Sequence, residues 1–309
     1  MRLHNDIIIS LAEKYCSEIF DVELLSVSHN IVYKINSKNP FILRITPENR
    51  QTKNGLFGEI KFINFLVNNR INAAAPMYSS ANEAITEIIF NNEIFYAIAF
   101  FLADGMQWYE RNDVEYFEHI GAELGKIHKA SKKYQPKNIK RRQYFNNGHL
   151  TEANNIFRNN KQELLKPYEN LLAFLSQMPK SSDNYGLVRG DFMLSNFNIT
   201  RKNKVTVYDF DECEYSWFLY DIATYIFYHI TGGNPVQAMN KQNEAEEALY
   251  KILSGYSKKN TLPLQELSSI DHFFKLRDFI LLSTILERGI SNSWEEEYIF
   301  TAFDRIINH

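Results

Sequence analysis

Three polar side chains between residues 186 and 213 are of the types that bind and position phosphates. They are Asp191, Asn196 and Asp209. Magnesium prefers hard oxygen ligands such as carboxylate and amide oxygens, and it shares its coordination sphere with nucleotide phosphates. A further carboxylate can orient a hydroxyl group for attack on phosphorus. The three side chains could therefore support phosphoryl transfer if the chain folds so that they converge.

A predicted antiparallel hairpin brings two of these side chains together. Residues 197–199 and 205–208 are rich in branched and aromatic side chains, and the polar segment between them is typical of a turn. A turn centred near Lys202 places Asn196 and Asp209 close together, at about the 5 Å spacing of cross-strand neighbours. The upstream aspartate can project into the same space from the preceding loop.

The N-terminal third of the chain predicts a small β-rich unit. Its expected strands are rich in branched and aromatic residues, and its expected helices carry apolar residues at helical spacing. An Asn91-Asn92 turn between the last two strands indicates a hairpin. The expected elements are a helix from Asn5 to about Glu18, strands at 23–28, 31–36 and 41–45, a helix at 56–67, and strands at 84–90 and 93–101.

Beyond Asp104 the pattern becomes mainly helical. Apolar side chains at helical spacing form a stripe from Val114 to Ile127, and further helical stretches begin at about Thr151 and recur to the C-terminus. The hairpin segment lies between these helices. We therefore expect two lobes, a β-rich lobe over residues 1–103 and a mainly helical lobe over residues 104–309.

The composition favours a globular protein that binds a small ligand. The chain has 309 residues, of which 45% are hydrophobic and 14% aromatic, and it can bury a substantial core. Its formal net charge of -3 provides no excess of cations for a nucleic-acid backbone. The longest apolar stretch, Ile94 to Ala103, is about half of the roughly 20 residues that a membrane-spanning helix needs. Two cysteines and no secretion-type N-terminus favour the cytoplasm, so neither nucleic acid nor membrane is an expected partner.

Two further polar features have structural explanations. His128 follows the predicted helical stripe without the tight spacing of metal ligands, so a packing or surface position is favoured. Glu295, Glu296 and Glu297 could form an acidic pocket for a cationic substrate. However, Ser293 before them is a typical N-cap, and acids in a first helical turn favour the helix dipole. Neither feature therefore adds a predicted site.

The segment Arg189–Asn196, followed by Tyr208–Asp211, resembles the kinase motif of the aminoglycoside phosphotransferase family, which also includes choline kinases and a class of homoserine kinases. The similarity continues through Leu219–Ala223. The resemblance implies an α+β, bilobal protein kinase-like fold. Its small β-rich N-terminal lobe would bind the nucleotide, and its larger, mainly helical C-terminal lobe would carry catalysis and substrate binding. ATP and Mg²⁺ are the implied cofactors.

The resemblance also implies roles for five acidic or amide side chains. Asp191 would be the catalytic base, and Asn196 and Asp209 would be the magnesium ligands. Asp211 would contact the metal or the substrate. Asp221 would brace the catalytic loop without touching the substrate.

In the N-terminal lobe, the resemblance implies a nucleotide-binding set. Arg44 would supply a cation to the phosphates, and Glu59 would be its partner from the following helix. Many relatives have lysine in place of Arg44; arginine keeps the charge but has a different geometry. A loop without glycine would cover the phosphates with backbone N–H groups, and residues at the lobe junction would receive adenine. These further candidates are Ser28, His29, Asn30, Phe100, Phe101 and Leu102.

The sequence departs from the family motif at Arg189, where histidine is usual. We assign Arg189 to structural support of the catalytic loop. This departure and the glycine-free loop motivate an alternative, a noncatalytic nucleotide-binding regulator of the same fold. Protein phosphorylation is a third interpretation, but the sequence after Asp209 resembles the small-molecule branch more closely.

The favoured function is an ATP- and Mg²⁺-dependent phosphotransferase that acts on a hydroxyl of a small molecule. The acceptor remains open among aminoglycosides, amino alcohols, homoserine-like amino acids and sugars. The sequence provides no marker for the oligomeric state.

Overall fold

The computed structural model describes residues 4–107, 116–136, 148–231 and 242–308. The chain divides into two compact units that are not contiguous in sequence. Unit 1 comprises residues 1–106, 134–141 and 197–211, and unit 2 comprises residues 107–133, 142–196 and 212–309.

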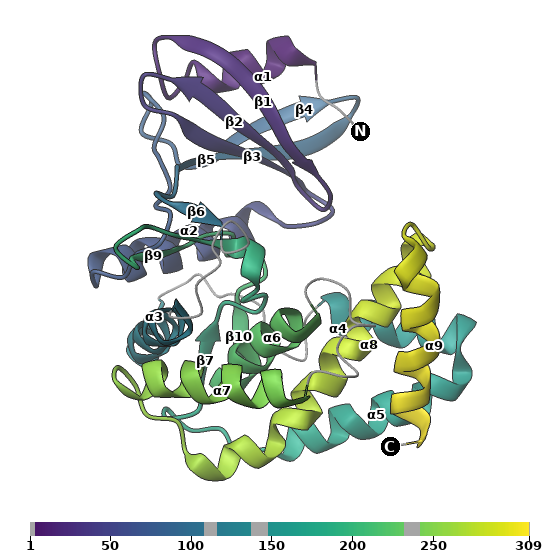
Figure 1. The fold of residues 1–309 in the computed structure, drawn as a ribbon. Coiled ribbons are helices and arrows are strands. Elements are labelled where there is room, and N and C mark those ends of the chain that lie inside the picture. The colour runs from purple at the N-terminus through teal and green to yellow at the C-terminus, as the bar shows by residue number, and fades with distance from the viewer. Residues whose placement is uncertain (1–3, 108–115, 137–147, 232–241, 309) are drawn as a thin grey trace. The chain divides into compact units, whose positions relative to one another are not determined.

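Unit 1 is built on a five-stranded antiparallel sheet (Figure 1). Alternate residues of β2 are buried, as expected for a strand with one face on a core. The buried residues Ile31, Tyr33 and Ile35 pack with Ile8 and Leu11 of the first helix. The sheet order is β1-β2-β3-β5-β4, with β1 at Ile19–Val27, β2 at Ile31–Ser37, β3 at Phe41–Pro47, β4 at Thr86–Phe90 and β5 at Glu93–Phe101.

The turn between β4 and β5 explains why the hairpin forms without glycine. Asn91 and Asn92 have φ angles of 51° and 63°. Two successive left-handed residues are what a two-residue hairpin turn requires, and asparagine tolerates this region better than most residues. Phe90 and Glu93 accordingly form the last pair of the ladder.

The first helix and the first strand differ from the sequence prediction. α1 spans Asn5–Ala12 and ends well before Glu18, and its N-cap residue is His4. The chain then turns, and β1 begins at Ile19 rather than Glu23. β1 is an edge strand with two register irregularities, so its burial does not alternate regularly. The periodicity that marks a strand in the sequence is therefore weak there.

α2 spans Lys53–Asn68 and begins earlier than predicted because of its cap. The side chain of Thr52 accepts a hydrogen bond from the Gly55 N–H at 3.2 Å, which satisfies one of the unpaired donors of the first turn. Glu59, on this helix, is buried.

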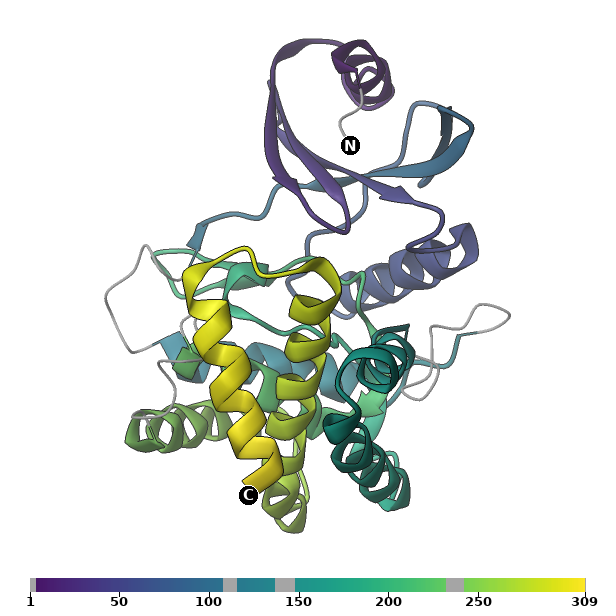
Figure 2. The same cartoon turned by 90° about the vertical axis from the view of Figure 1, so that its right-hand side faces the viewer.

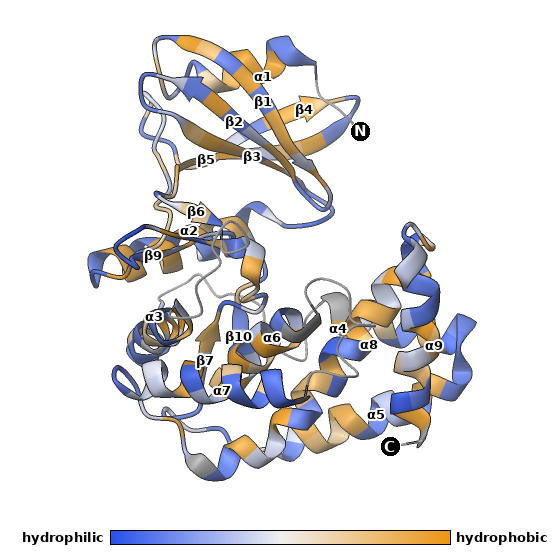
Figure 3. Cartoon of the chain, in the orientation of Figure 1, coloured by the Kyte–Doolittle hydropathy of each residue, from blue (hydrophilic) through white to orange (hydrophobic). Residues whose placement is uncertain are grey.

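Unit 2 is mainly helical, with one short antiparallel pair of strands, β7 and β10. α8 and α9 lie side by side (Figure 2). In Figure 3 the helix α6 shows hydrophobic colours on part of its surface and hydrophilic colours on the rest. The helices are α3 (Tyr116–Ser131), α4 (Gly148–Asn160), α5 (Gln162–Gln177), α6 (Phe218–Thr231), α7 (Gln242–Ser257), α8 (Ile270–Arg288) and α9 (Ser293–Asn308), with β7 at Tyr185–Val188, β10 at Glu214–Trp217, and short 3-10 helices at Leu194–Asn196 and Leu264–Ser269.

Glycines allow α3 and α7 to approach until their backbones touch. A Cβ atom on Gly121 would lie 2.1 Å from the carbonyl oxygen of Ile252, and one on Gly255 would lie 1.9 Å from that of Glu118. Any side chain at either position would force the helices apart. Val114, the first residue of the predicted stripe, lies outside the described residues.

The start of α9 supports the structural explanation of the acidic cluster. The buried side chain of Glu295 accepts a hydrogen bond from the Ser291 N–H at 2.7 Å and pairs with Arg288 at 2.6 Å. The hydrogen bond from Arg288 is the main reason that the pKa of Glu295 is lowered to about 2. Glu295 therefore serves the helix start. Ser293, the predicted N-cap, is instead the first residue of the helix.

Candidate active site

The predicted hairpin is present in unit 1. β8 (Phe197–Ile199) pairs with β9 (Val205–Val207), and its outer pairs join Phe197 to Val207 and Ile199 to Val205. This register is centred on Lys202, as predicted. The turn is closed by a hydrogen bond from the Thr200 N–H to the Lys204 carbonyl oxygen at 3.0 Å.

Asp209 follows this hairpin in a backbone conformation that side chains rarely adopt. Its φ angle is 61°, and a non-glycine residue in this region persists only where surrounding structure holds it. The next residue, Phe210, is buried and its ring lies edge-on to that of Phe62 on α2, with centroids 6.0 Å apart. The Asp209 side chain stays 42% exposed, so it is accessible while its backbone is anchored.

Arg44 and Glu59 form the ion pair that the sequence predicted. Two parallel hydrogen bonds join the guanidinium to the carboxylate, at 2.9 Å and 2.7 Å. Burial alone would lower the pKa of Arg44, but the carboxylate of Glu59 raises it above the usual value. Arg44 also lies 3.6 Å from Asp209 and 5.1 Å from the centre of the Phe100 ring. Unit 1 therefore holds a permanent cation beside the exposed carboxylate.

Asp211 is tied to the loop that follows β1. Asn30 donates from Nδ2 to Asp211 Oδ2 at 2.8 Å, and it accepts from Thr46 Oγ1 at 2.8 Å. Burial would raise the pKa of Asp211, but the nearby cations Arg44 and Arg50 and the hydrogen bond from Asn30 lower it below the usual range. Asp211 is thus an ionised carboxylate that already has partners within unit 1.

The predicted nucleotide-binding residues differ in accessibility. The Asn30 side chain is almost buried, whereas Ser28 and His29 are exposed. The Ser28 N–H donates to the Asn30 carbonyl oxygen at 3.0 Å, so this N–H serves the loop itself. Phe100 is buried, but Phe101 and Leu102 are 56% and 38% exposed. Exposed apolar surface for a flat base is therefore present at Phe101 and Leu102 rather than at Phe100.

In unit 2, Asp221 holds the backbone of the loop that carries Asp191. Its two carboxylate oxygens accept hydrogen bonds from the N–H groups of Arg189 and Gly190, both at 2.9 Å. Gly190 has a φ angle of 85°, and a Cβ atom there would lie 2.3 Å from the carbonyl oxygen of Glu212. The Arg189 side chain is fully buried. These contacts fix the path of the chain immediately before Asp191.

His128 forms a hydrogen bond with Asp221 that the sequence analysis did not predict. Its Nε2 lies 3.0 Å from Asp221 Oδ2, and its Nδ1 lies 3.0 Å from the Tyr256 hydroxyl. Burial lowers the pKa of His128 despite the hydrogen bond to Asp221, so the ring is neutral near pH 7. A carboxylate can only accept, which assigns the proton to Nε2 and makes Nδ1 the acceptor of the Tyr256 O–H. Asn260 in turn donates to the Tyr256 oxygen at 2.8 Å.

Asp191 and Asn196 contact each other through their side chains. Asn196 Nδ2 donates to Asp191 Oδ2 at 3.3 Å and to its backbone oxygen at 3.1 Å. Because the amide nitrogen is used in this way, the amide oxygen is the atom that can ligate a hard cation. The Asp191 side chain remains 25% exposed and also pairs with Arg277 of α8 at 3.2 Å. Asn196 and Asp209 belong to different compact units, and their predicted proximity stays a prediction.

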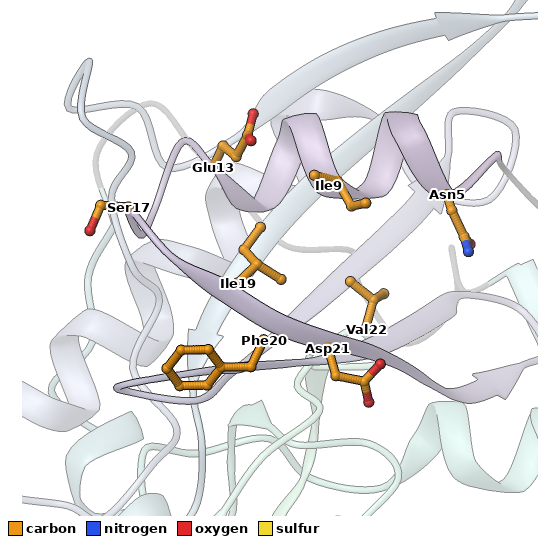
Figure 4. Close-up of a pocket in the computed structure, with 8 residues that line it drawn as sticks. All are labelled: Asn5, Ile9, Glu13, Ser17, Ile19, Phe20, Asp21 and Val22. Carbon is orange, nitrogen blue, oxygen red and sulfur yellow. The ribbon is translucent and has the colours of Figure 1, made fainter.

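A hollow of about 380 Å³ in unit 1 is lined by none of the predicted site residues (Figure 4). It lies between α1 and β1, and Glu13 and Asp21 at its rim are both acidic. Two carboxylates without a paired cation in the lining would repel a nucleotide phosphate. This hollow is therefore a poor candidate for the phosphate-binding part of the site.

None of the described helices combines the length and apolarity needed to span a membrane. No group of three or more His, Cys, Asp and Glu side chains in the described ranges is arranged to hold a metal ion.

Comparison with known proteins identifies relatives along nearly the whole chain. The model of the phosphotransferase enzyme family matches residues 22–255. Amicoumacin kinase of Bacillus subtilis (strain 168) is 26% identical over 294 residues, which cover 93% of this chain and 86% of that protein.

Solved structures show the same fold. An amicoumacin kinase in complex with AMP-PNP, Ca²⁺ and Ami matches with a TM-score of 0.86 at 23% identity, covering 99% of this chain and 94% of that one. A microcompartment-associated aminopropanol kinase matches with a TM-score of 0.79 at 18% identity, covering 98% and 95%. The predicted α+β kinase-like fold, with an antiparallel-sheet unit and a mainly helical unit, is confirmed.

Proposed function

Because the chain belongs to the phosphotransferase enzyme family and is an enzyme that phosphorylates a hydroxyl of a small molecule, we propose that it uses ATP with Mg²⁺ and that Asp191 orients the acceptor hydroxyl. The observation that carries this assignment is the attachment of the Asp191 loop to Asp221 through two backbone N–H groups. A loop fixed in this way presents an accessible carboxylate at a constant position, and phosphoryl transfer depends mainly on positioning and electrostatics.

Asn196 and Asp209 are the proposed magnesium ligands. Both offer hard oxygen atoms, and Asn196 has already committed its amide nitrogen to Asp191. Asp209 is exposed and held in a strained conformation, a combination typical of functional positions. Mg²⁺, when bound, would neutralise phosphate charge. Asp211, which is already bonded within unit 1, is proposed to support Asp209 through the shared cation Arg44.

Arg44 is the proposed phosphate cation, and Glu59 fixes its orientation. The bidentate pair leaves the Arg44 side chain little freedom, so it can attract phosphate without first becoming ordered. The exposed side chains Phe101 and Leu102 are the proposed adenine contacts. Ser28 and His29 are proposed to lie near the phosphates, whereas Asn30 acts through Asp211.

The acceptor is proposed to be a small hydroxyl compound of the aminoglycoside, amino alcohol or homoserine type. Relatives are described as kinases of amicoumacin and aminopropanol and as a spectinomycin phosphotransferase. The cytoplasm is the proposed location, because ATP is abundant there. The noncatalytic regulator has no support from these relatives, and the backbone N–H of Arg189 donates to Asp221, which anchors the loop.

The test is phosphate transfer from ATP to amicoumacin, aminopropanol, spectinomycin, choline and homoserine, in the presence of Mg²⁺. We expect Asp191→Asn to lower kcat by about 1,000-fold, the middle of the range for a lost general base. Asp209→Ala should abolish metal-dependent turnover. Asp209→Ala should keep its melting temperature within about 4 °C of the parent, which corresponds to roughly 1 kcal/mol. Asp191→Asn should lower the melting temperature further, because it leaves the buried Arg277 cation without its carboxylate partner.

Asp183→Asn is the matched control for loss of a carboxylate. Asp183 is exposed and pairs with Lys132 at 3.4 Å, so the control should retain parental turnover and stability. Turnover that survives in Asp191→Asn would contradict the assignment of the base, and metal-dependent turnover in Asp209→Ala would contradict the assignment of the ligand.

A further inference from the structure

Arg277 is a buried cation beside the proposed base, and the kinase motif does not account for it. It lies on α8 and is 6% exposed. Its Nη1 donates to the Tyr220 hydroxyl at 3.0 Å, and its Nη2 donates to Asp191 Oδ1 at 3.2 Å and to the Tyr228 hydroxyl. The guanidinium is therefore held by three groups, one of which is the proposed base.

The charge and orientation of Arg277 are fixed by its surroundings. Burial alone would lower its pKa, but the phenols of Tyr228 and Tyr220 and the carboxylate of Asp191 raise the pKa well above its ordinary value. Burial also raises the pKa of both tyrosines, so both phenols stay neutral and accept from the guanidinium. Among the described residues, Asp191 is the one carboxylate paired with this cation.

Asp191 is consequently restrained at both carboxylate oxygens. Arg277 holds Oδ1 from α8, and Asn196 holds Oδ2 from the 3-10 helix after the loop. Each oxygen keeps a second lone pair for a further donor. A carboxylate held from two sides has one orientation and needs no rearrangement to meet an acceptor hydroxyl.

We propose that Arg277 is a positioning residue for the transfer reaction, which acts through Asp191 by fixing the orientation of its carboxylate. The inference rests on the proposed function, because it takes Asp191 as the base. Arg277 does not touch the acceptor in this scheme. Its contribution is made before the acceptor arrives, since it removes the rotational freedom that the Asp191 side chain would otherwise have.

Arg305 provides a matched control within the same unit. Its Nη2 donates to Asp278 Oδ1 at 2.8 Å, and its guanidinium lies 5.9 Å from the ring centre of Tyr298. The Tyr298 hydroxyl donates to the same Asp278 oxygen at 2.7 Å. This cluster has the same side-chain types as that of Arg277 but contains none of the proposed reaction residues. Arg305→Met therefore measures how much the loss of such a cluster lowers stability when no proposed reaction residue is affected.

The experiment is a double-mutant cycle between Arg277→Met and Asp191→Asn, with Arg277→Lys, Tyr228→Phe and Arg305→Met alongside. Two activities are measured with ATP and Mg²⁺, namely phosphorylation of amicoumacin and hydrolysis of ATP without an added acceptor. The melting temperature of each variant is measured in parallel.

We expect Arg277→Met to lower kcat by about 100-fold with the KM for ATP unchanged within about 2-fold. Arg277→Lys should recover about 10-fold of this loss, because the charge returns without the planar fork. Tyr228→Phe, which loosens Arg277 without touching Asp191, should lower kcat by about 5-fold.

In the Asp191→Asn background, Arg277→Met should cause less than about 2-fold further loss, because both changes act through one group. Arg305→Met should lower the melting temperature at least as much as Arg277→Met does but change kcat by less than about 3-fold. The non-additive cycle is the result that a purely structural role of Arg277 would not produce.

Two results would overturn the positioning role. In the first, the effects of Arg277→Met and Asp191→Asn on kcat add independently. In the second, Asp191→Asn is inactive but Arg277→Met lowers kcat no more than Arg305→Met does. Either result leaves the proposed function intact. If Arg277→Met does not fold, Arg277→Lys and Tyr228→Phe decide: parental kcat in both overturns the role. Parental turnover in Asp191→Asn, or a parent without either activity, overturns the proposed function and this inference with it.

Discussion

The two units each place a buried arginine beside a carboxylate of the proposed site, but they hold the arginine differently. Arg44 in unit 1 is bound by Glu59 through two hydrogen bonds and lies 3.6 Å from Asp209. Arg277 in unit 2 is bound by two neutral phenols and lies 3.2 Å from Asp191. The charge of Arg44 is therefore balanced by Glu59, which is neither the proposed base nor a proposed metal ligand, whereas the charge of Arg277 is balanced by the proposed base itself.

Arg44 and Arg277 therefore differ in whether their charge is balanced independently of the proposed base and metal ligands. The charge of Arg44 is largely matched before any ligand binds, so its orientation does not depend on Asp209. Arg277 and Asp191 depend on each other, because neutral phenols orient the arginine without cancelling its charge. Changes at Arg44 should therefore appear mainly in stability and nucleotide affinity, and changes at Arg277 mainly in kcat.

The strongest test of this contrast is the stability of Arg44→Met. The substitution leaves the fully buried carboxylate of Glu59 without its partner, which we expect to lower the free energy of unfolding by about 4 kcal/mol. Arg277→Met leaves Asp191, which is 25% exposed, and water can solvate it. Its cost should be about 1 kcal/mol by comparison. Denaturant unfolding of both variants measures the difference.

The double variant Arg44→Met/Glu59→Leu is the control for this prediction. Removal of both charges should restore most of the lost stability, since no buried charge remains unpaired. The affinity for ATP should stay reduced by about 10-fold, because one charged contact to phosphate is lost. Parental ATP affinity in the double variant would remove Arg44 from the proposed nucleotide-binding set.

The second prediction concerns Asp221, which orients the loop by backbone contacts alone. In Asp221→Asn one carboxylate oxygen becomes an NH₂ group, which faces the N–H of either Arg189 or Gly190. The loop should shift, and we expect kcat to fall by about 100-fold, the effect of misplacing a reacting group by about 1 Å. Steady-state kinetics with MgATP and the best acceptor measures it.

Asp278→Asn is the comparison variant for Asp221→Asn. Asp278 is also buried, and burial raises its pKa, but it accepts from Tyr298 and Arg305 rather than from the catalytic loop. It should lose stability and keep kcat within about 3-fold. Equal loss of kcat in the two variants would mean that Asp221 acts on the fold as a whole.

The sequence predicted the parts of the site whose residues lie in locally patterned segments. The hairpin register followed from two short strands and a polar turn, whereas the Arg44–Glu59 pair was implied by the resemblance to the kinase family. The contacts that hold these parts were not predictable. Arg277 is 86 positions from Asp191, and Asn30 is 181 positions from Asp211. Periodicity reports which face of an element is buried, but not which distant element will meet it.

His128 illustrates the same limit in a different way. The sequence favoured a packing or surface position, and the side chain is buried against Phe218, with ring centroids 4.5 Å apart. Its hydrogen bond to Asp221 spans 93 positions. No local pattern distinguishes a histidine that only packs from one that also donates to a buried carboxylate. This hydrogen bond can be identified only from the structure, where Asp221 on α6 lies beside His128.

The smallest predicted effect is a pH dependence of stability at this histidine. Burial lowers the pKa of folded His128 below its ordinary value of 6.5, so below that pH the unfolded chain binds a proton that the folded chain does not. The stabilising contribution of the neutral ring is therefore fully present above pH 6.5 and is lost as the pH falls below it. Melting temperatures measured from about pH 7.5 to about pH 5 should decline accordingly.

His128→Gln isolates this contribution, because glutamine can still donate to Asp221 but does not titrate. The variant should be less stable than the parent at neutral pH, since it lacks the aromatic packing against Phe218, and the difference in melting temperature between the two should narrow as the pH falls.

His272→Gln is the parallel control. Burial also lowers the pKa of His272, but that side chain stacks on Phe174 and does not contact Asp221. Its variant should change the pH profile of stability without changing kcat at neutral pH. A constant gap between the parent and His128→Gln across the whole range would show that His128 has the same protonation in the folded and unfolded chains, and the neutral donor assigned to Asp221 would then be wrong.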